Sequence, residues 1–157
     1  MQCLLGKLKL ALRILPLVQK LNELDLVYCD WKMDNIGLDE DDLIKILDAD
    51  NLKFKSRIEG TKCEKNEDCF NLYGCKSNCS ENGKCKMHST NIQYVCDSMF
   101  LHGTTKTSSG LLGNNETSSS QLMDVLEHCS QLGFNDVYLV KNAIEKELQD
   151  INQRKHF

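Results

Sequence analysis

The chain has 157 residues, of which 41% are hydrophobic and 27% charged, so it has the composition of a single globular domain. Its formal net charge of -4 argues against a general nucleic-acid-binding protein, which would carry a basic surface. No apolar run approaches the roughly 18 residues that a membrane-spanning helix needs. Nine cysteines are far more than ordinary usage, and most of them lie close together.

Residues 1–25 are predicted to be helical. Apolar residues recur there at helical spacing, at Leu4, Leu8, Ala11, Leu12 and Leu15. The basic residues between them interrupt any apolar core of a signal peptide, so an amphipathic helix is the better interpretation. Pro16 is expected to kink this helix or to separate it from a second stretch over 17–24. If the chain enters the secretory pathway, its signal or membrane anchor is expected upstream of the sequence shown.

Residues 26–60 have the pattern of short strands joined by acidic turns. Strands are predicted at 26–28, 36–38 and 43–47, because these segments are apolar or rich in β-branched residues. The acidic run 39–42 separates the last two and is predicted to be a turn. These two strands should therefore pair as a hairpin.

Two helices are predicted at the end of the chain, over 122–132 and 137–151, each with one apolar stripe. Serines 118–120 are candidates for the N-cap of the first helix, and Gly133 for its end. The preceding segment 103–120 is rich in Gly, Ser, Thr and Asn, so it is expected to be an exposed, mobile loop.

The segment 28–35 carries the strongest chemical signal. Protein kinases use a catalytic loop H-R-D-x-x-x-x-N and then a metal-binding aspartate at the end of a strand. Asp30 precedes Asn35 by the spacing of that loop, Lys32 has the place of a phosphate-contacting lysine, and Asp48 follows a strand, turn and strand. We expect Asp30 and Lys32 to be catalytic, Asn35 and Asp48 to hold a metal ion, and these residues to converge at one cleft.

Other interpretations of this segment remain. A D-x-x-x-x-N spacing alone occurs by chance in surface loops, whereas an EF-hand is excluded because no D-x-[DN]-x-[DN]-G run is present. The sequence also departs from a typical kinase. Tyr28 and Cys29 replace the His and Arg of the motif, and Asp50 stands where the D-F-G glycine would be.

Six of the cysteines lie within residues 63–96, and an even number in a short polar block is typical of disulfides in an oxidising compartment. The candidates for disulfide bonds are Cys63, Cys69, Cys75, Cys79, Cys85 and Cys96. Sequence does not choose among their pairings. A zinc site made from Cys75, Cys79, Cys85 and His88 is the competing hypothesis, although paired C-x-x-C knuckles are absent.

The remaining cysteines and two sequons add further expectations. Since nine is an odd number, Cys3, Cys29 and Cys129 cannot all be paired within this chain. Asn115 begins a glycosylation sequon, Asn-Glu-Thr, in the predicted loop, and Asn78 begins a poorer one.

The elements Glu67-Asp68-Cys69 and Val95-Cys96-Asp97, together with the spacing of the cysteines, resemble the divergent protein kinase domain 1 family. These are cysteine-rich, kinase-like proteins of the secretory pathway. That family also has a Cys-Asp pair in place of H-R-D and an Asp-x-Asp form in place of D-F-G, as at 29–30 and 48–50 here. The resemblance covers about residues 5–155.

The resemblance implies an α+β fold over 1–157. It would be a kinase-like C-lobe, mainly helical, with a small β-hairpin, a disulfide-rich insert over 61–100 in place of the activation segment, and no N-lobe. It also implies ATP with Mg²⁺ or Mn²⁺ as cofactors. The missing N-lobe or an upstream membrane anchor is the expected partner, and the location is the endoplasmic-reticulum lumen or, alternatively, outside the cell.

Three functions compete at this point. The first is phosphoryl transfer from ATP to a protein or glycan hydroxyl, carried out with an N-lobe. The second is a catalytically inactive pseudokinase or lumenal binding module, and the third is an unrelated disulfide-rich interaction domain. The helices outside the cysteine block disfavour the third, since small secreted scaffolds rarely have them. The isolated chain is expected to lack measurable kinase activity, because nothing in it covers the nucleotide phosphates.

Overall fold

The structure is a computed structural model that describes residues 2–72, 75–102, 110–113, 118–131 and 133–154. Its helices are α1 (Gln2–Glu23), α2 (Lys55–Glu59), α3 (Asn91–Tyr94), α4 (Ser120–Cys129) and α5 (Val137–Arg154), with short helical turns η1 (Met33–Asn35) and η2 (Asn66–Asp68) and the π-helical η3 (Val95–Leu101). Its strands are β1 (Leu26–Tyr28), β2 (Ile36–Leu38), β3 (Ile44–Ile46), β4 (Leu52–Phe54), β5 (Asn71–Leu72), β6 (Cys75–Cys79) and β7 (Cys85–Met87).

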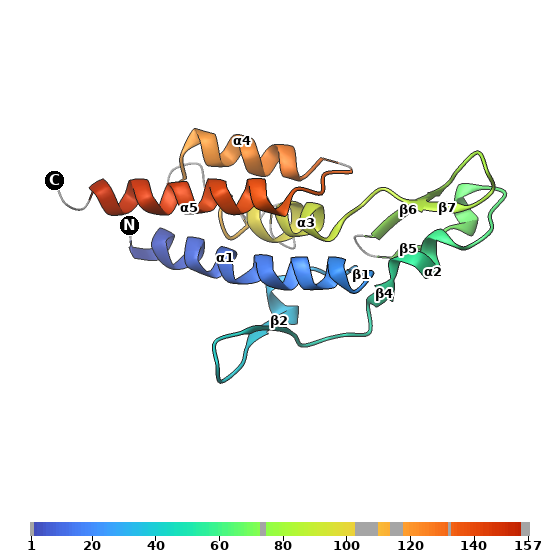
Figure 1. Cartoon of the computed structure of the whole chain (residues 1–157), viewed down its shortest axis with the longest axis horizontal. Coiled ribbons are helices and arrows are strands. Elements are labelled where there is room, and N and C mark those ends of the chain that lie inside the picture. Colours follow the sequence, from blue (N-terminus) through green and yellow to red (C-terminus); the bar gives the residue numbers. More distant parts are fainter. Residues whose placement is uncertain (1, 73–74, 103–109, 114–117, 132, 155–157) are drawn as a thin grey trace.

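The three long helices form the body of the molecule. Helix α5 lies between α1 and α4, and α3 and η3 pack against α1 and α4 (Figure 1). Their apolar stripes are fully buried, for example at Leu8, Ile14, Leu126 and Ile144. This mixture of helices with small sheets is the α+β class expected from the sequence. The predicted helices over 122–132 and 137–151 are confirmed with small differences at their ends.

Helix α1 runs without a break through Pro16, so the expected separation into two helices is wrong. Pro16 lies on the exposed side of α1, where water can hydrogen-bond the carbonyl that a proline leaves without a donor. Its buried neighbours Leu15 and Val18 hold the helix against the core on both sides of the proline. Tertiary packing therefore outweighs the lost hydrogen bond.

The predicted strands are present and form two small antiparallel pairs. Strand β2 pairs with β3, with Ile36 opposite Ile46, so the hairpin expected across the acidic turn is confirmed. Strand β1 pairs with β4, which the sequence did not reveal. Figure 1 shows the hairpin projecting from the side of α1, while β5, β6 and β7 lie beyond one end of the helices.

The end of η3 is covered by residues that were expected to be mobile. The amide groups of Gly110, Leu111 and Leu112 donate to carbonyls of η3 at 2.7–2.8 Å. Leu112 is only 1% exposed, and a Cβ on Gly110 would lie 2.6 Å from the backbone of Phe100. The prediction of an exposed loop is therefore wrong for 110–113, because their backbone satisfies carbonyls at the end of η3. Residues 103–109 and 114–117, with Asn115, lie outside the described residues.

Four disulfides join the cysteines, as Cys29–Cys75, Cys63–Cys79, Cys69–Cys85 and Cys96–Cys129. All six clustered cysteines are thus oxidised, as predicted, and Cys3 is free and exposed. The zinc hypothesis is not supported, since its three cysteines have three different disulfide partners. Two of the bonds leave the cysteine-rich segment. One of these, Cys96–Cys129, belongs to the helical core, where residues 91–100 of the expected insert are also packed.

Candidate functional site

The candidate site lies where β1 ends and the chain turns through η1 into the β2–β3 hairpin. Strand β1 is held in place by Asn91, which is 2% exposed. The Asn91 side chain accepts a hydrogen bond from the amide of Tyr28 at 2.9 Å and donates to the carbonyl of Leu26 at 2.8 Å. A buried amide with its hydrogen bonds satisfied fixes the backbone it contacts. The loop that follows Tyr28 therefore starts from a rigid point.

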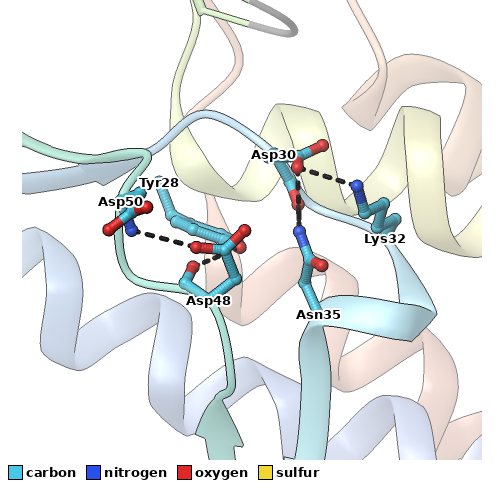
Figure 2. A network of polar contacts seen from close by, with 6 residues as sticks. All are labelled: Tyr28, Asp30, Lys32, Asn35, Asp48 and Asp50. Carbon is cyan, nitrogen blue, oxygen red and sulfur yellow. Dashed lines mark hydrogen bonds and ion pairs between the residues drawn. The ribbon is translucent and has the colours of Figure 1, made fainter.

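Three of the four predicted site residues meet at one carboxylate. Oδ2 of Asp30 accepts hydrogen bonds from the Lys32 ammonium group and from the Asn35 side-chain amide, each at 2.9 Å (Figure 2). The Asn35 amide also donates to the main-chain carbonyl of Asp30 at 3.0 Å, which closes the loop. Among the described residues, Oδ1 of Asp30 has no hydrogen-bond partner, so it remains available to an incoming hydroxyl group.

The ion pair between Asp30 and Lys32 is partly shielded from water. The side chain of Asp30 is 15% exposed and that of Lys32 33% exposed. The hydrogen bond with Asp30 is the main cause that raises the pKa of Lys32 above its usual value, although burial opposes it. Lys32 is therefore a cation at any physiological pH, as a phosphate-contacting group must be.

Asp48 reaches the site through the hairpin and through Tyr28. The amide of Leu47 donates to the carbonyl of Asn35 at 2.8 Å, which brings the end of β3 back beside η1. The fully buried Tyr28 donates its hydroxyl group to the carbonyl of Asp48 at 2.8 Å. Burial raises the pKa of this Tyr28 hydroxyl, and the negative charges of Asp30 and Asp48 act in the same direction. Through its hydroxyl group Tyr28 therefore ties the main chain of Asp48 to the end of β1.

The carboxylate of Asp48 is exposed and faces solvent beside Tyr28 (Figure 2). Its Oδ1 accepts from the amide of Asp50 at 3.2 Å. The predicted residues thus gather on one side of the chain, but Asp48 is joined to the other three indirectly. The carboxylate and amide oxygens of Asp48 and Asn35 are hard ligands, which suits Mg²⁺ or Mn²⁺.

Sequence reasoning missed the roles of Tyr28, Asn91 and the Cys29–Cys75 disulfide in holding this site. In the sequence, Tyr28 departs from a kinase motif and ends the predicted strand 26–28, and the apolar character of that strand is the one signal that Tyr28 is buried. Asn91 begins an apolar helical segment, which is a weak signal for a buried amide. The two Asn91 hydrogen bonds span 63 and 65 residues of chain, whereas the Tyr28 contact with Asp48 spans 20 and the disulfide spans 46.

One comparison with known proteins identifies a family for this chain. A family described as "Protein-kinase domain of FAM69" matches residues 5–132, which include Asp30, Lys32, Asn35 and Asp48. No curated protein and no solved structure matches the chain significantly. The match covers most of the chain and agrees with the resemblance noted in the sequence. The chain belongs to the family of the FAM69 protein-kinase domain.

Proposed function

We propose that this chain is the catalytic-loop part of a kinase-like phosphotransferase that transfers the γ-phosphoryl group of ATP to a protein or glycan hydroxyl. The observation that carries the proposal is the hydrogen-bonded group of Asp30, Lys32 and Asn35. It supplies a carboxylate for the attacking hydroxyl and a cation for the phosphoryl group. Membership of a kinase-domain family supports it independently.

Asp30 would orient the substrate hydroxyl through Oδ1, since its other oxygen is taken by Lys32 and Asn35. Lys32 would turn from Asp30 toward the transferring phosphoryl group and balance its negative charge. Exchange of one anionic partner for another costs little at a group that is one-third exposed. Phosphoryl transfer depends mainly on such positioning and charge stabilisation.

Asn35 and Asp48 would hold Mg²⁺ or Mn²⁺ through their oxygen atoms. Two protein ligands suffice for such an ion in kinase sites, because nucleotide phosphates and water complete the coordination. When bound, the ion would neutralise charge on the phosphates of ATP. Tyr28 supports this role by fixing the main chain of Asp48. An N-lobe that covers the nucleotide is the partner this proposal requires.

The four disulfides fit a non-cytosolic, oxidising compartment. No helix within the described residues is long and apolar enough to span a membrane. We propose the endoplasmic-reticulum lumen as the location, with an anchor elsewhere in the protein and secretion as the alternative. Asn78 is exposed on β6, opposite Lys86, and would be accessible to glycosylation.

The second candidate function is a pseudokinase or lumenal binding module. One observation favours it: Lys32 and Asp30 form an ion pair in the absence of any substrate, so each charge is already neutralised by the other. In a binding module this pair would simply stabilise the loop. The two candidates differ in whether removing a charge at the site changes phosphoryl transfer.

The test is ATP turnover and autophosphorylation by the full-length protein, purified with its disulfides intact. Asp30→Asn and Asp48→Asn should each lower the rate by ~10²-fold or more, because each removes a group that acts on the reacting phosphates or hydroxyl. Asp41→Asn is the matched control, since its carboxylate is exposed and lies in the turn of the hairpin, outside the group. Protein and glycan acceptors are then compared as substrates. A folded protein without turnover, or turnover that survives Asp48→Asn, contradicts the proposal.

A further inference from the structure

The Cys29–Cys75 disulfide connects the candidate site to the segment that follows it in the chain. Cys29 is the residue directly before Asp30, and Cys75 begins β6, 46 positions further on. Both residues are buried, with 2% and 1% exposure, and both belong to the main hydrophobic core. The insert disulfides Cys63–Cys79 and Cys69–Cys85 instead join residues within the insert.

Two buried anchors hold the backbone on either side of Asp30: the disulfide at Cys29, and Trp31, which is 4% exposed and packs edge-on against the Tyr28 ring in the main core. Residues 29–32 belong to no helix or strand, although the amide of Cys29 donates to the carbonyl of Asn51 at 3.1 Å. The Asn35 side chain closes the loop on itself and does not attach it to the rest of the protein. The covalent bond at Cys29 is thus the strongest link between the Asp30 backbone and the insert.

In protein kinases the segment after the metal-binding aspartate is ordered when its phosphate pairs with arginine side chains. Here Cys75 lies in the corresponding segment after Asp48, and Cys29 stands directly before the candidate catalytic aspartate. A disulfide at this place makes the same kind of connection without a phosphate. It is also permanent while the protein remains in an oxidising compartment.

We propose that Cys29 and Cys75 are positioning residues, and that their disulfide holds the Asp30 loop against the insert so that the site is assembled by oxidation and not by phosphorylation. The inference rests on the proposed phosphotransfer at Asp30. The bond forms by thiol–disulfide exchange: the two thiols give up two protons and two electrons, and a disulfide oxidant of the compartment is reduced to two thiols.

The first test is amide hydrogen exchange on the intact chain, which needs no activity. In Cys29→Ala/Cys75→Ala, amides in 30–36 should exchange at least ~10-fold faster, while α1 and α5 keep their protection. The control Cys63→Ala/Cys79→Ala removes a disulfide of the insert and should leave 30–36 unchanged. Unchanged exchange at 30–36 in the first variant overturns the inference. A second variant, Cys29→Val/Cys75→Ala, refills part of the space that the disulfide leaves. If α1 and α5 lose their protection in both variants, the effect is global and the inference is also overturned.

The second test separates positioning from general stability. In the full-length protein the Cys29/Cys75 variant should lower kcat for ATP turnover by ~10²-fold, the cost of a misplaced group, with KM for ATP nearly unchanged. The Cys63/Cys79 control should keep kcat. Equal kcat in parent and Cys29/Cys75 variant overturns the inference while phosphotransfer stands. Absence of turnover in the parent counts against the proposed function, and the exchange result then decides the positioning role by itself.

Discussion

The helical layer and the cysteine-rich insert are stabilised by different means. In the helical layer, side chains such as Leu8, Val140 and Ile144 are fully buried and exclude water over the length of α1 and α5. In the insert, the strands have two to five residues, and the separate apolar cluster consists of cysteines. Each of the two insert disulfides spans 16 positions, which corresponds to about 3 kcal/mol of chain entropy. Burial is therefore the main source of stability in the helical layer, where Cys96–Cys129 adds one covalent bond, and disulfides are the main source in the insert.

The candidate site lies at the junction of these two regions. Asn91 ties β1 to the helical layer, while Cys29 ties the next residues to β6 of the insert. The loop that carries Asp30 thus depends on both kinds of stabilisation. A change in either region should affect the site in a distinguishable way.

The largest expected effect comes from opening a cavity in the helical layer. Phe100 is fully buried in η3, so Phe100→Ala should lower the free energy of unfolding by about 3–5 kcal/mol. Phe54→Ala is the matched control, because Phe54 is 48% exposed. Urea denaturation followed by circular dichroism measures both. Equal losses in the two variants would contradict the assignment of the core to this layer.

A smaller and local effect is expected from removing a bond of the insert. Cys69→Ala/Cys85→Ala should cost the insert about 3 kcal/mol and leave the helices folded. Limited proteolysis should then cut within 61–88 much faster than in the parent, while α1 and α5 stay intact. Cooperative loss of the helices in this variant would show that the two regions are not stabilised separately.

The smallest effect concerns the acidic turn of the hairpin. The hydrogen bond from Lys45 is the main cause that lowers the pKa of Asp39 below its ordinary value of 3.8, and the amide of Leu43 adds to this effect. Because the pKa in the folded state is lowered, this stabilisation is complete above pH 3.8 and is lost as pH falls through the lower folded value. Asp39→Asn should therefore be less stable than the parent at neutral pH, and the difference should shrink in acid. Chemical denaturation at several pH values measures the difference in the free energy of unfolding between the two proteins. A difference that stays constant with pH would contradict the prediction.

Periodicity and local spacing predicted the parts of the fold that depend on neighbouring residues. The helices α4 and α5, strands β1 to β3 and the hairpin follow from patterns within about twenty residues. The disulfide partners did not follow, because Cys29 and Cys129 join the clustered cysteines from distant parts of the chain. The π-helical η3 and the anchoring of 110–113 were missed for the same reason, since both depend on tertiary contacts.

The candidate site divides in the same way. The Asp30–Asn35 contact spans five residues, so its spacing in the sequence was sufficient to predict it. The approach of Asp48 followed from the hairpin. Tyr28 precedes that hairpin in the chain and Asp48 follows it. No local sequence pattern predicts that a tyrosine hydroxyl group will bind a carbonyl 20 residues away.

The most direct test of the central claim is the location of a bound divalent cation. The claim is that Asn35 and Asp48 form one oxygen site beside Asp30. Mn²⁺ added to the isotopically labelled chain should broaden NMR signals of 30–36 and 47–50, and Asp48→Asn should abolish the broadening at Asn35. The matched control, Asp41→Asn, should leave it unchanged. Broadening confined to the acidic turn 39–42, or unaffected at Asn35 by Asp48→Asn, would contradict the account.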